Sequence, residues 1–163
     1  MRLIEVVNSI PTLLLLLAIL GIIEEPSVIY VMLVIGLIRW TGIAKFIRAE
    51  LLKIRALEYI EASRAMGFTE FRIMLHHAIP NALHPVIISF AFGIASAILI
   101  ESSLSFLGIG VAPEAVTWGS MLHAARSDFS AWWLAVFPGI AIFISVTMFN
   151  LIGEGLSDAL NPK

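Results

Sequence analysis

Residues 129–153 read FSAWWLAVFPGIAIFISVTMFNLIG and contain no charged side chain. An α-helix needs about 20 consecutive apolar residues to cross about 30 Å of hydrocarbon. This stretch therefore predicts a membrane-spanning helix over about 131–153, with Pro138 inside it.

The composition of the whole chain agrees with a membrane protein. Hydrophobic residues make up 60% of the 163 residues and charged residues 13%, and the mean hydropathy is +0.98. Soluble domains carry about 25% charged residues, roughly twice as many. The net charge of −2 does not suggest a nucleic-acid partner. The absence of cysteine excludes disulfides, thiolate zinc sites and cysteine nucleophiles.

Three further apolar runs predict spans at about 6–23, 27–46 and 83–106. The first run turns back at Glu24-Glu25-Pro26, which indicates a helical hairpin. The second run is long enough only if Arg39 and Lys45 extend to the interface. We expect Pro80 and Pro85 to break the uncharged stretch from Ile73 to Ile100, whose spanning part is about 83–106. The expected fold is an all-α, polytopic helical bundle of four spans, forming one domain over residues 1–163.

The placement of basic residues predicts the orientation. Seven of the ten lysines and arginines lie at the end of the second span or between it and the third: Arg39, Lys45, Arg48, Lys53, Arg55, Arg64 and Arg72. Cytoplasmic loops carry an excess of Lys and Arg, so this loop is expected in the cytoplasm. Four spans then place both termini in the cytoplasm and residues 107–130 outside.

The loop over residues 47–80 has a pattern of its own. Apolar residues recur at helical spacing among its charges, which predicts an amphipathic helix. Gly67 suits the left-handed position just after a helix end, Thr69 suits the cap of a second short helix, and Pro80 would close the segment. Two interpretations follow: a helix–Gly–helix element presented to the cytoplasm, or a surface loop lying on the lipid headgroups.

The residues of this loop resemble a known motif. Residues 61–85, EASRAMGFTEFRIMLHHAIPNALHP, are similar to the EAA loop of membrane subunits in binding-protein-dependent ABC importers, in the dipeptide/oligopeptide/nickel branch. Further agreement comes from ESSLSFLGIG (101–110), WGSML (118–122), FPG (137–139) and FNLIGEGL (149–156). Ser63 and His77 depart from the general EAA pattern. The family subunit has six spans, so the resemblance implies that two amino-terminal spans are absent here, in a fragment or an unusually short permease.

The resemblance implies an ABC type I permease-like fold in a bacterial or archaeal cytoplasmic membrane. The chain would be the membrane-spanning subunit of an ATP-driven importer for peptides or a related small solute such as nickel. Its partners would be cytoplasmic ABC ATPase subunits, a second homologous permease subunit, an extracytoplasmic solute-binding protein and membrane lipid. The sequence has no G-x-x-x-x-G-K-[ST] motif, so we expect a transport subunit, not an enzyme, with ATP used by the ATPase subunits and no cofactor or metal bound by this chain.

The resemblance also implies a role for the loop, which would dock in a cleft of the ATPase. The residues concerned are Glu61, Ala62, Ser63, Arg64, Gly67 and Pro80. Small side chains at 62 and 63 would permit close approach, and Glu61 and Arg64 could add charge-assisted contacts. ATP-driven closure of the ATPase dimer would then move the bundle between inward-open and outward-open states.

Other polar residues are weaker candidates. Glu101, with Ser102 and Ser105, is a candidate pathway or gate group, because a carboxylate within an apolar stretch is costly unless it is paired, protonated or near water. The alternative is that Glu101 hydrogen-bonds a neighbouring helix, helped by these serines. Trp118 and Arg126 are candidates for docking of a binding protein. The alternative is that they belong to a loop that is merely solvated.

The four histidines invite a metal site. They are His76, His77, His84 and His123, and the first two are adjacent, so they point to different helix faces and are poor co-ligands. Solvated or interfacial histidines fit this spacing better.

Two other classes of membrane protein predict different sequence features. An ion-gradient-driven transporter or channel fragment predicts several intramembrane charges or an internal repeat, and an intramembrane enzyme predicts a nucleophile–base or metal constellation. The sequence offers one intramembrane carboxylate, no clear repeat and no H-E-x-x-H.

Overall fold

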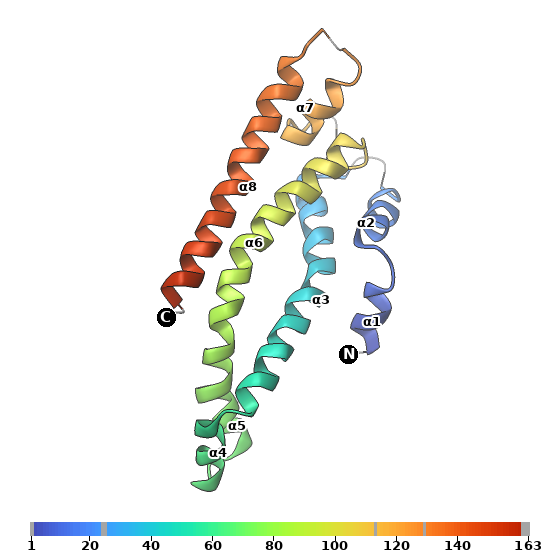
Figure 1. Cartoon of the computed structure of the whole chain (residues 1–163). Coiled ribbons are helices and arrows are strands. Elements are labelled where there is room, and N and C mark those ends of the chain that lie inside the picture. The colour runs from blue at the N-terminus through green and yellow to red at the C-terminus, as the bar shows by residue number, and fades with distance from the viewer. Residues whose placement is uncertain (1, 24–25, 113, 129, 161–163) are drawn as a thin grey trace.

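The computed structural model describes residues 2–23, 26–112, 114–128 and 130–160, and every regular element among them is helical. Three long helices lie side by side: α3 (Val28–Arg55), α6 (Ile79–Phe106) and α8 (Trp133–Leu160) (Figure 1). The helices α1 (Arg2–Asn8) and α2 (Thr12–Leu20) run beside α3. The short helix α7 (Trp118–Ala124) lies at one end of the bundle, and α4 (Glu58–Ala65) and α5 (Glu70–Ile73) form a hairpin at the other. The predicted polytopic helical fold is confirmed.

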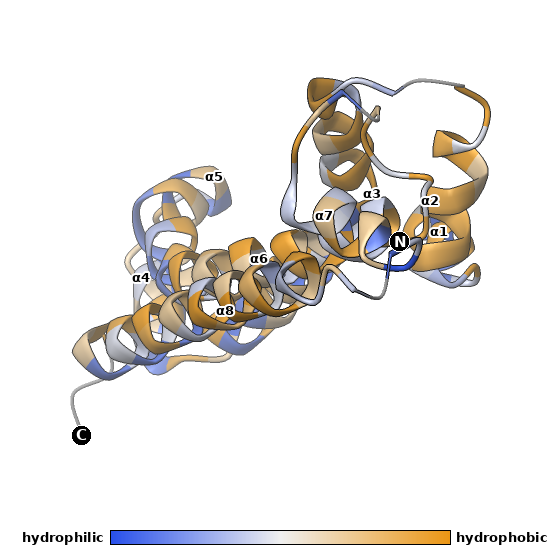
Figure 2. Cartoon of the chain, turned by 90° about the horizontal axis from the view of Figure 1, so that it is seen from above, coloured by the Kyte–Doolittle hydropathy of each residue, from blue (hydrophilic) through white to orange (hydrophobic). Residues whose placement is uncertain are grey.

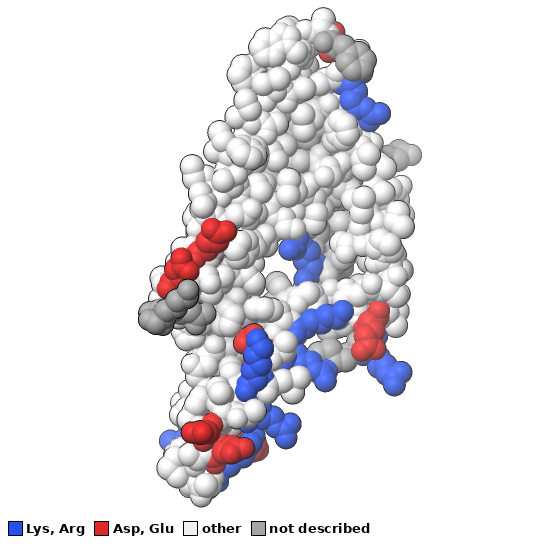
Figure 3. Space-filling view, in the orientation of Figure 1, with Lys and Arg blue, Asp and Glu red and all other residues white. Residues whose placement is uncertain are grey.

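Three of these helical stretches are long and apolar enough to cross a membrane: Val28–Arg55, Glu70–Phe106 and Trp133–Leu160. Their outward faces carry large apolar side chains, among them Leu33, Leu37 and Phe143, which are 66–70% exposed. Hydrophilic residues instead gather on α4 and α5 (Figure 2). On the face drawn in Figure 3, most lysine and arginine side chains lie in the half of the molecule that ends in this hairpin. Outward apolar faces of this kind are expected where lipid is the solvent.

The amino-terminal apolar run differs from its prediction. Residues 6–23 do not form one helix, because α1 ends at Asn8 and α2 begins at Thr12. Pro11 is extended (φ −54°, ψ 128°) and has no N–H to donate, and the Ser9 hydroxyl donates to the Val6 carbonyl 2.7 Å away. Nine residues of α2 rise only about 13.5 Å, so neither helix alone spans a bilayer. The predicted turn at Glu24-Glu25 lies outside the described residues, and a fourth span stays a prediction.

The prediction that Pro80 and Pro85 break the third apolar run is wrong. The helix is continuous from Glu70 to Phe106, through the π-helical turn η1 (Met74–Ala78) and into α6. Pro80 follows this widened turn directly, and Pro85 lies inside α6. A π turn re-spaces the backbone hydrogen bonds, which accommodates a residue that lacks an N–H. Likewise α3 passes the expected boundary at residue 46 without a break and ends at Arg55.

Two clusters of buried side chains hold the helices together. The larger one joins α2, α3 and the end of α6 through Leu16, Leu20, Val31, Val34, Ile35, Ile38 and Leu104. The smaller one, which we call the hairpin core, consists of Ile54, Ile60, Ile73 and Ala82, one residue from each of α3, α4, α5 and α6. The described ends of the chain both point toward the hairpin half of the molecule (Figure 1). The cytoplasmic placement of both termini stays a prediction.

The contact between α7 and α6 depends on a glycine. Thr117 caps α7 by accepting from the Ser120 N–H (3.2 Å), and the Ser120 hydroxyl accepts in return from the Thr117 N–H (2.9 Å). Gly119 then lies directly on α6, where a Cβ atom would stand 2.6 Å from the Ser102 carbonyl oxygen. Only a residue without a side chain fits this approach of two backbones.

Replacing Gly119 by alanine is expected to destabilise the fold by about 1–3 kcal/mol, because the added methyl group must push α7 away from α6. Gly139→Ala on α8 is the matched control, since a Cβ there meets nothing within 4 Å. Thermal unfolding of the purified protein in detergent measures both effects. Equal midpoints for the two variants would contradict the close α6–α7 contact.

Candidate functional site

The α4–α5 hairpin turns at Gly67. Its φ of +82° is in the left-handed region, as the sequence predicts, and only glycine adopts it without strain. The turn is closed by the Gly67 N–H, which donates to the Arg64 carbonyl (2.9 Å), and the Phe68 N–H, which donates to the Ser63 carbonyl (3.2 Å). Thr69 caps α5 as predicted, because its hydroxyl accepts from the Arg72 N–H at 3.4 Å.

An ion pair ties the two arms of the hairpin. Arg64 on α4 donates from Nε and Nη2 to the two carboxylate oxygens of Glu70 on α5, at 2.7 and 3.3 Å. The hydrogen bond from Arg64 lowers the pKa of Glu70 below its ordinary value, and the same bond raises the pKa of Arg64. The pair is exposed to solvent, so its effect is to fix the angle of the arms more than to add stability.

The predicted docking residues fall on different sides of the hairpin. Glu61, Ala62 and Gly67 are exposed, whereas Ser63 is buried and its hydroxyl donates to the Tyr59 carbonyl (2.7 Å). Ser63 therefore belongs to the inner face of the hairpin, and its docking role stays a prediction. The Arg64 side chain is 36% exposed and engaged by Glu70. Pro80 lies beyond η1 on α6, where it does not close the segment.

Two apolar side chains of the hairpin were missed by sequence reasoning. Met66 and Phe71 flank the Gly67 turn and are 65% and 67% exposed. Helical periodicity predicts that apolar residues face inward, and it gives no sign of which ones remain outside a four-residue helix. The hairpin thus exposes two large apolar side chains in addition to Glu61 and Ala62.

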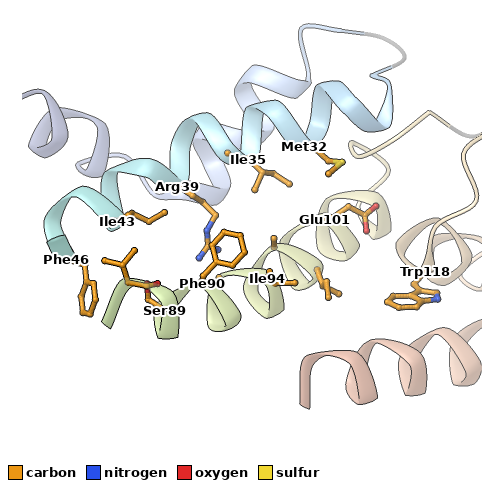
Figure 4. Close-up of a pocket in the computed structure, with 16 residues that line it drawn as sticks. Met32, Ile35, Arg39, Ile43, Phe46, Ser89, Phe90, Ile94, Glu101 and Trp118 are labelled. Atoms are coloured by element: carbon orange, nitrogen blue, oxygen red, sulfur yellow. The ribbon is translucent and has the colours of Figure 1, made fainter. Parts of the chain in front are cut away.

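A second feature is a groove between α3 and α6, which we call the α3–α6 groove (Figure 4). It lies between a face of α3 from Met32 to Phe46 and a face of α6 from Val86 to Glu101, and its volume is about 690 Å³. Trp118 of α7 lies at the Glu101 end (Figure 4). Two predicted site residues, Glu101 and Trp118, line this groove.

Arg39 does not extend to the interface as predicted. It points from α3 toward α6 in the α3–α6 groove (Figure 4). Its Nη1 donates to the Ser96 hydroxyl of α6 at 2.6 Å. The polar partner of this guanidinium is thus on the facing helix α6.

The candidate gate residues do not lie on one surface of α6; they are Glu101, Ser102 and Ser105. Glu101 lines the groove and accepts from the Ser105 hydroxyl at 2.7 Å, which is a bond within its own helix. Ser102 is buried against α7, at the Gly119 contact. The Ser105 hydroxyl also accepts, weakly at 3.5 Å, from the Val111 N–H of the following loop. Of the three, Glu101 alone lines the groove.

Trp118 and Arg126 are also separated by the fold. Trp118 lines the groove, while the Arg126 guanidinium lies 5.3 Å from the centre of the Phe106 ring. His123 Nδ1 is 2.8 Å from the Phe106 carbonyl oxygen, and His76 Nδ1 is 3.3 Å from that of Arg72. Among the described residues, no three His, Cys, Asp or Glu side chains gather as a metal site would require.

Comparison with known proteins identifies the family. Residues 1–163 match the binding-protein-dependent transport system inner membrane component family. The chain belongs to this family. The resemblance of the residue 61–85 loop and of the motifs after it is thus confirmed over the whole chain.

Several curated members of this permease family are similar to the chain. A putative peptide transport system permease of Brucella suis is 46% identical over 122 residues, covering 74% of this chain and 41% of that protein. A glutathione transport system permease of Pectobacterium atrosepticum is 37% identical over 164 residues, covering 100% of this chain and 54% of that protein. A putative peptide permease of Brucella ovis is 38% identical over 168 residues, covering 100% of this chain and 55% of that protein. The chain spans about half the length of these permeases.

Gly67→Val is expected to strain this permease-family hairpin by about 1–2 kcal/mol, because a branched side chain rarely adopts positive φ. Crowding is not the reason, since a Cβ at Gly67 meets nothing within 4 Å. Gly67→Asn is the matched control, because asparagine tolerates this conformation. Amide hydrogen exchange over residues 63–70 should speed up in the valine variant alone. Equal exchange in both variants would contradict the conformational requirement.

Proposed function

We propose that the chain is the membrane-spanning subunit of an ATP-driven importer for short peptides, coupled to separate ATPase subunits through the α4–α5 hairpin. The observation that carries this proposal is the continuity of the helices that leave the hairpin. α3 runs unbroken from the apolar region to Arg55, and the helix from Glu70 runs unbroken to Phe106. A force on the hairpin would thus reach α6 through an unbroken helix and α3 across a turn of two residues, Ala56 and Leu57.

The hairpin core supports this coupling role. Ile60 and Ile73 are nearly inaccessible to solvent, and they join the arms of the hairpin to Ile54 of α3 and Ala82 of α6. The hairpin therefore moves with the helices rather than independently of them. Glu61, Ala62 and Met66 remain on the outside, where a cleft of an ATPase would receive them. Closure of two such ATPases would draw two permease subunits from one discrete state to another.

Peptides are proposed as the substrate class because the similar permeases are named for peptide and glutathione transport. Nickel stays an expectation from the resemblance alone. The further partners that we propose are a second homologous permease subunit and an extracytoplasmic solute-binding protein, the latter on the α7 side, opposite the hairpin (Figure 1). ATP is consumed by the ATPase subunits in this scheme.

Because the natural chain has no cysteine, a single introduced cysteine reports its own surroundings. The complex would be reconstituted in vesicles with its ATPase and partner permease. Ala62→Cys should react with a membrane-impermeant maleimide from the cytoplasmic side, and bound ATPase should slow this labelling at least about tenfold. Burial of the thiol in the ATPase cleft is the physical reason, since such a contact excludes the reagent.

Two matched variants control the experiment. Ser63→Cys, one residue further and buried, should label poorly with or without ATPase. Glu114→Cys, exposed in the loop before α7, should label only from the opposite side and be indifferent to ATPase. Labelling of Ala62→Cys that is unchanged by ATPase would refute the coupling role, and labelling of both exposed cysteines from one side would refute the orientation. Dependence of uptake on an ion gradient instead of ATP would favour the secondary-transporter alternative.

A further inference from the structure

A shallow depression lies on α3 near the end that leads into the hairpin. Every residue that lines it belongs to α3, and we call it the α3 depression. Its lining combines four apolar side chains with two arginines: Ala44, Ile47, Arg48, Leu51, Leu52 and Arg55. The depression thus carries both an apolar strip and a concentrated positive charge.

Helix geometry places the two arginines on one face of α3. Arg48 and Arg55 are seven residues apart, which is almost two full turns, so their side chains leave the helix within about 20° of each other. Both are exposed. Phe46, which lines the α3–α6 groove, leaves the helix about 160° away from Arg48. The α3 depression therefore faces away from α6.

The depression crosses the edge of the hydrocarbon on the hairpin side. Arg48 lies twenty residues after Val28, where α3 begins, and this rise of about 30 Å equals the hydrocarbon thickness. Ala44 lies about 6 Å before that edge and Arg55 about 10.5 Å beyond it. The long stem of an arginine allows its guanidinium to turn back toward the edge. The apolar strip is therefore level with acyl chains, and the guanidinium groups are level with lipid headgroups.

The described part of the chain does not neutralise these two arginines. Neither Arg48 nor Arg55 takes part in the two ion pairs found among the described residues. Residues 45–55 contain four basic side chains and one acidic side chain, Glu50, which Lys53 already holds at 2.7 Å. The end of α3 thus keeps an excess of positive charge at the membrane surface, where basic side chains of the molecule gather (Figure 3).

Two guanidinium groups beside an apolar strip match one class of ligand. Guanidinium binds phosphate oxygens through paired hydrogen bonds, and basic segments next to a membrane helix attract anionic lipids. A water-soluble protein reaches the arginines but not Ala44 and Ile47, which lie at the depth of the acyl chains. We propose that the α3 depression binds an anionic phospholipid, with its phosphate held by Arg48 and Arg55 and an acyl chain along the apolar strip.

This site is independent of the transported solute, but it lies next to the hairpin. Arg55 is the last residue of α3, and α4 begins at Glu58. Ile54, the neighbour of Arg55, belongs to the hairpin core. A phospholipid bound at Arg48 and Arg55 would therefore hold this end of α3 at the membrane surface, directly before the element that we propose to meet the ATPase.

Titration of the purified protein in detergent with phosphatidylglycerol tests the proposal, with the bound lipid counted by native mass spectrometry. We expect saturable binding, and binding of phosphatidylcholine that is at least about fivefold weaker, because that headgroup has no net charge. Arg48→Gln and Arg55→Gln should each weaken phosphatidylglycerol binding at least about fivefold, because each removes one of the two phosphate contacts. Lys53→Gln is the matched control and should leave the affinity unchanged. It removes the same charge from the same segment, but Lys53 is held by Glu50 and does not line the depression.

Other results would overturn the proposal. Equal weakening in all three variants would indicate a diffuse attraction to basic charge and no defined site. No saturable binding to the natural protein would indicate that another helix covers the depression. Displacement of the lipid by millimolar glycerol phosphate would indicate a site for soluble phosphates. Arg48→Lys keeps the positive charge and should bind phosphatidylglycerol more tightly than Arg48→Gln, whereas equal binding by these two variants would contradict a contact made through charge.

Discussion

Hydrocarbon offers no hydrogen bonds, so a chain within it must satisfy its backbone inside its own helices. That constraint explains why α3, α6 and α8 are long and why two prolines do not divide α6. The π turn at Met74–Ala78 precedes Pro80 and re-spaces the hydrogen bonds there. The same continuity extends the membrane helices to the hairpin. There the hairpin core of Ile54, Ile60, Ile73 and Ala82 joins α3, α4, α5 and α6. A requirement of the lipid phase thus also makes the water-exposed end rigid.

Local features of the fold were predictable from the sequence, and features that depend on a distant partner were not. The left-handed Gly67 and the cap at Thr69 follow from side chains close by, and both were predicted. The length of uncharged runs likewise predicted the long helices. The split at Ser9–Pro11, the burial of Ser63 and the direction of Arg39 were not predicted, because each depends on which face meets another helix. For Arg39 the deciding contact is Ser96, 57 positions further along the chain.

The candidate sites divide in the same way. The motif around Glu61 and Gly67 was recognisable because its residues are adjacent, and the structure adds that Met66 and Phe71 stand beside them. The α3–α6 groove was beyond prediction, because half of it lies on each of two helices. Glycines show the difference most clearly. Gly119 and Gly93 look alike in the sequence, yet the first permits backbone contact and the second leaves space.

The π turn also has a rotational consequence. Each residue of an α-helix turns the chain by about 100°, and a π turn holds one residue more than the α-helical turn it replaces. Ile73, before this turn, faces the hairpin core, whereas the stripe from Val86 to Glu101, after it, faces α3. The turn Met74–Ala78 therefore sets the phase between the two ends of one helix. A shortened chain with one residue fewer at this point could keep its hairpin or its groove in register, but not both.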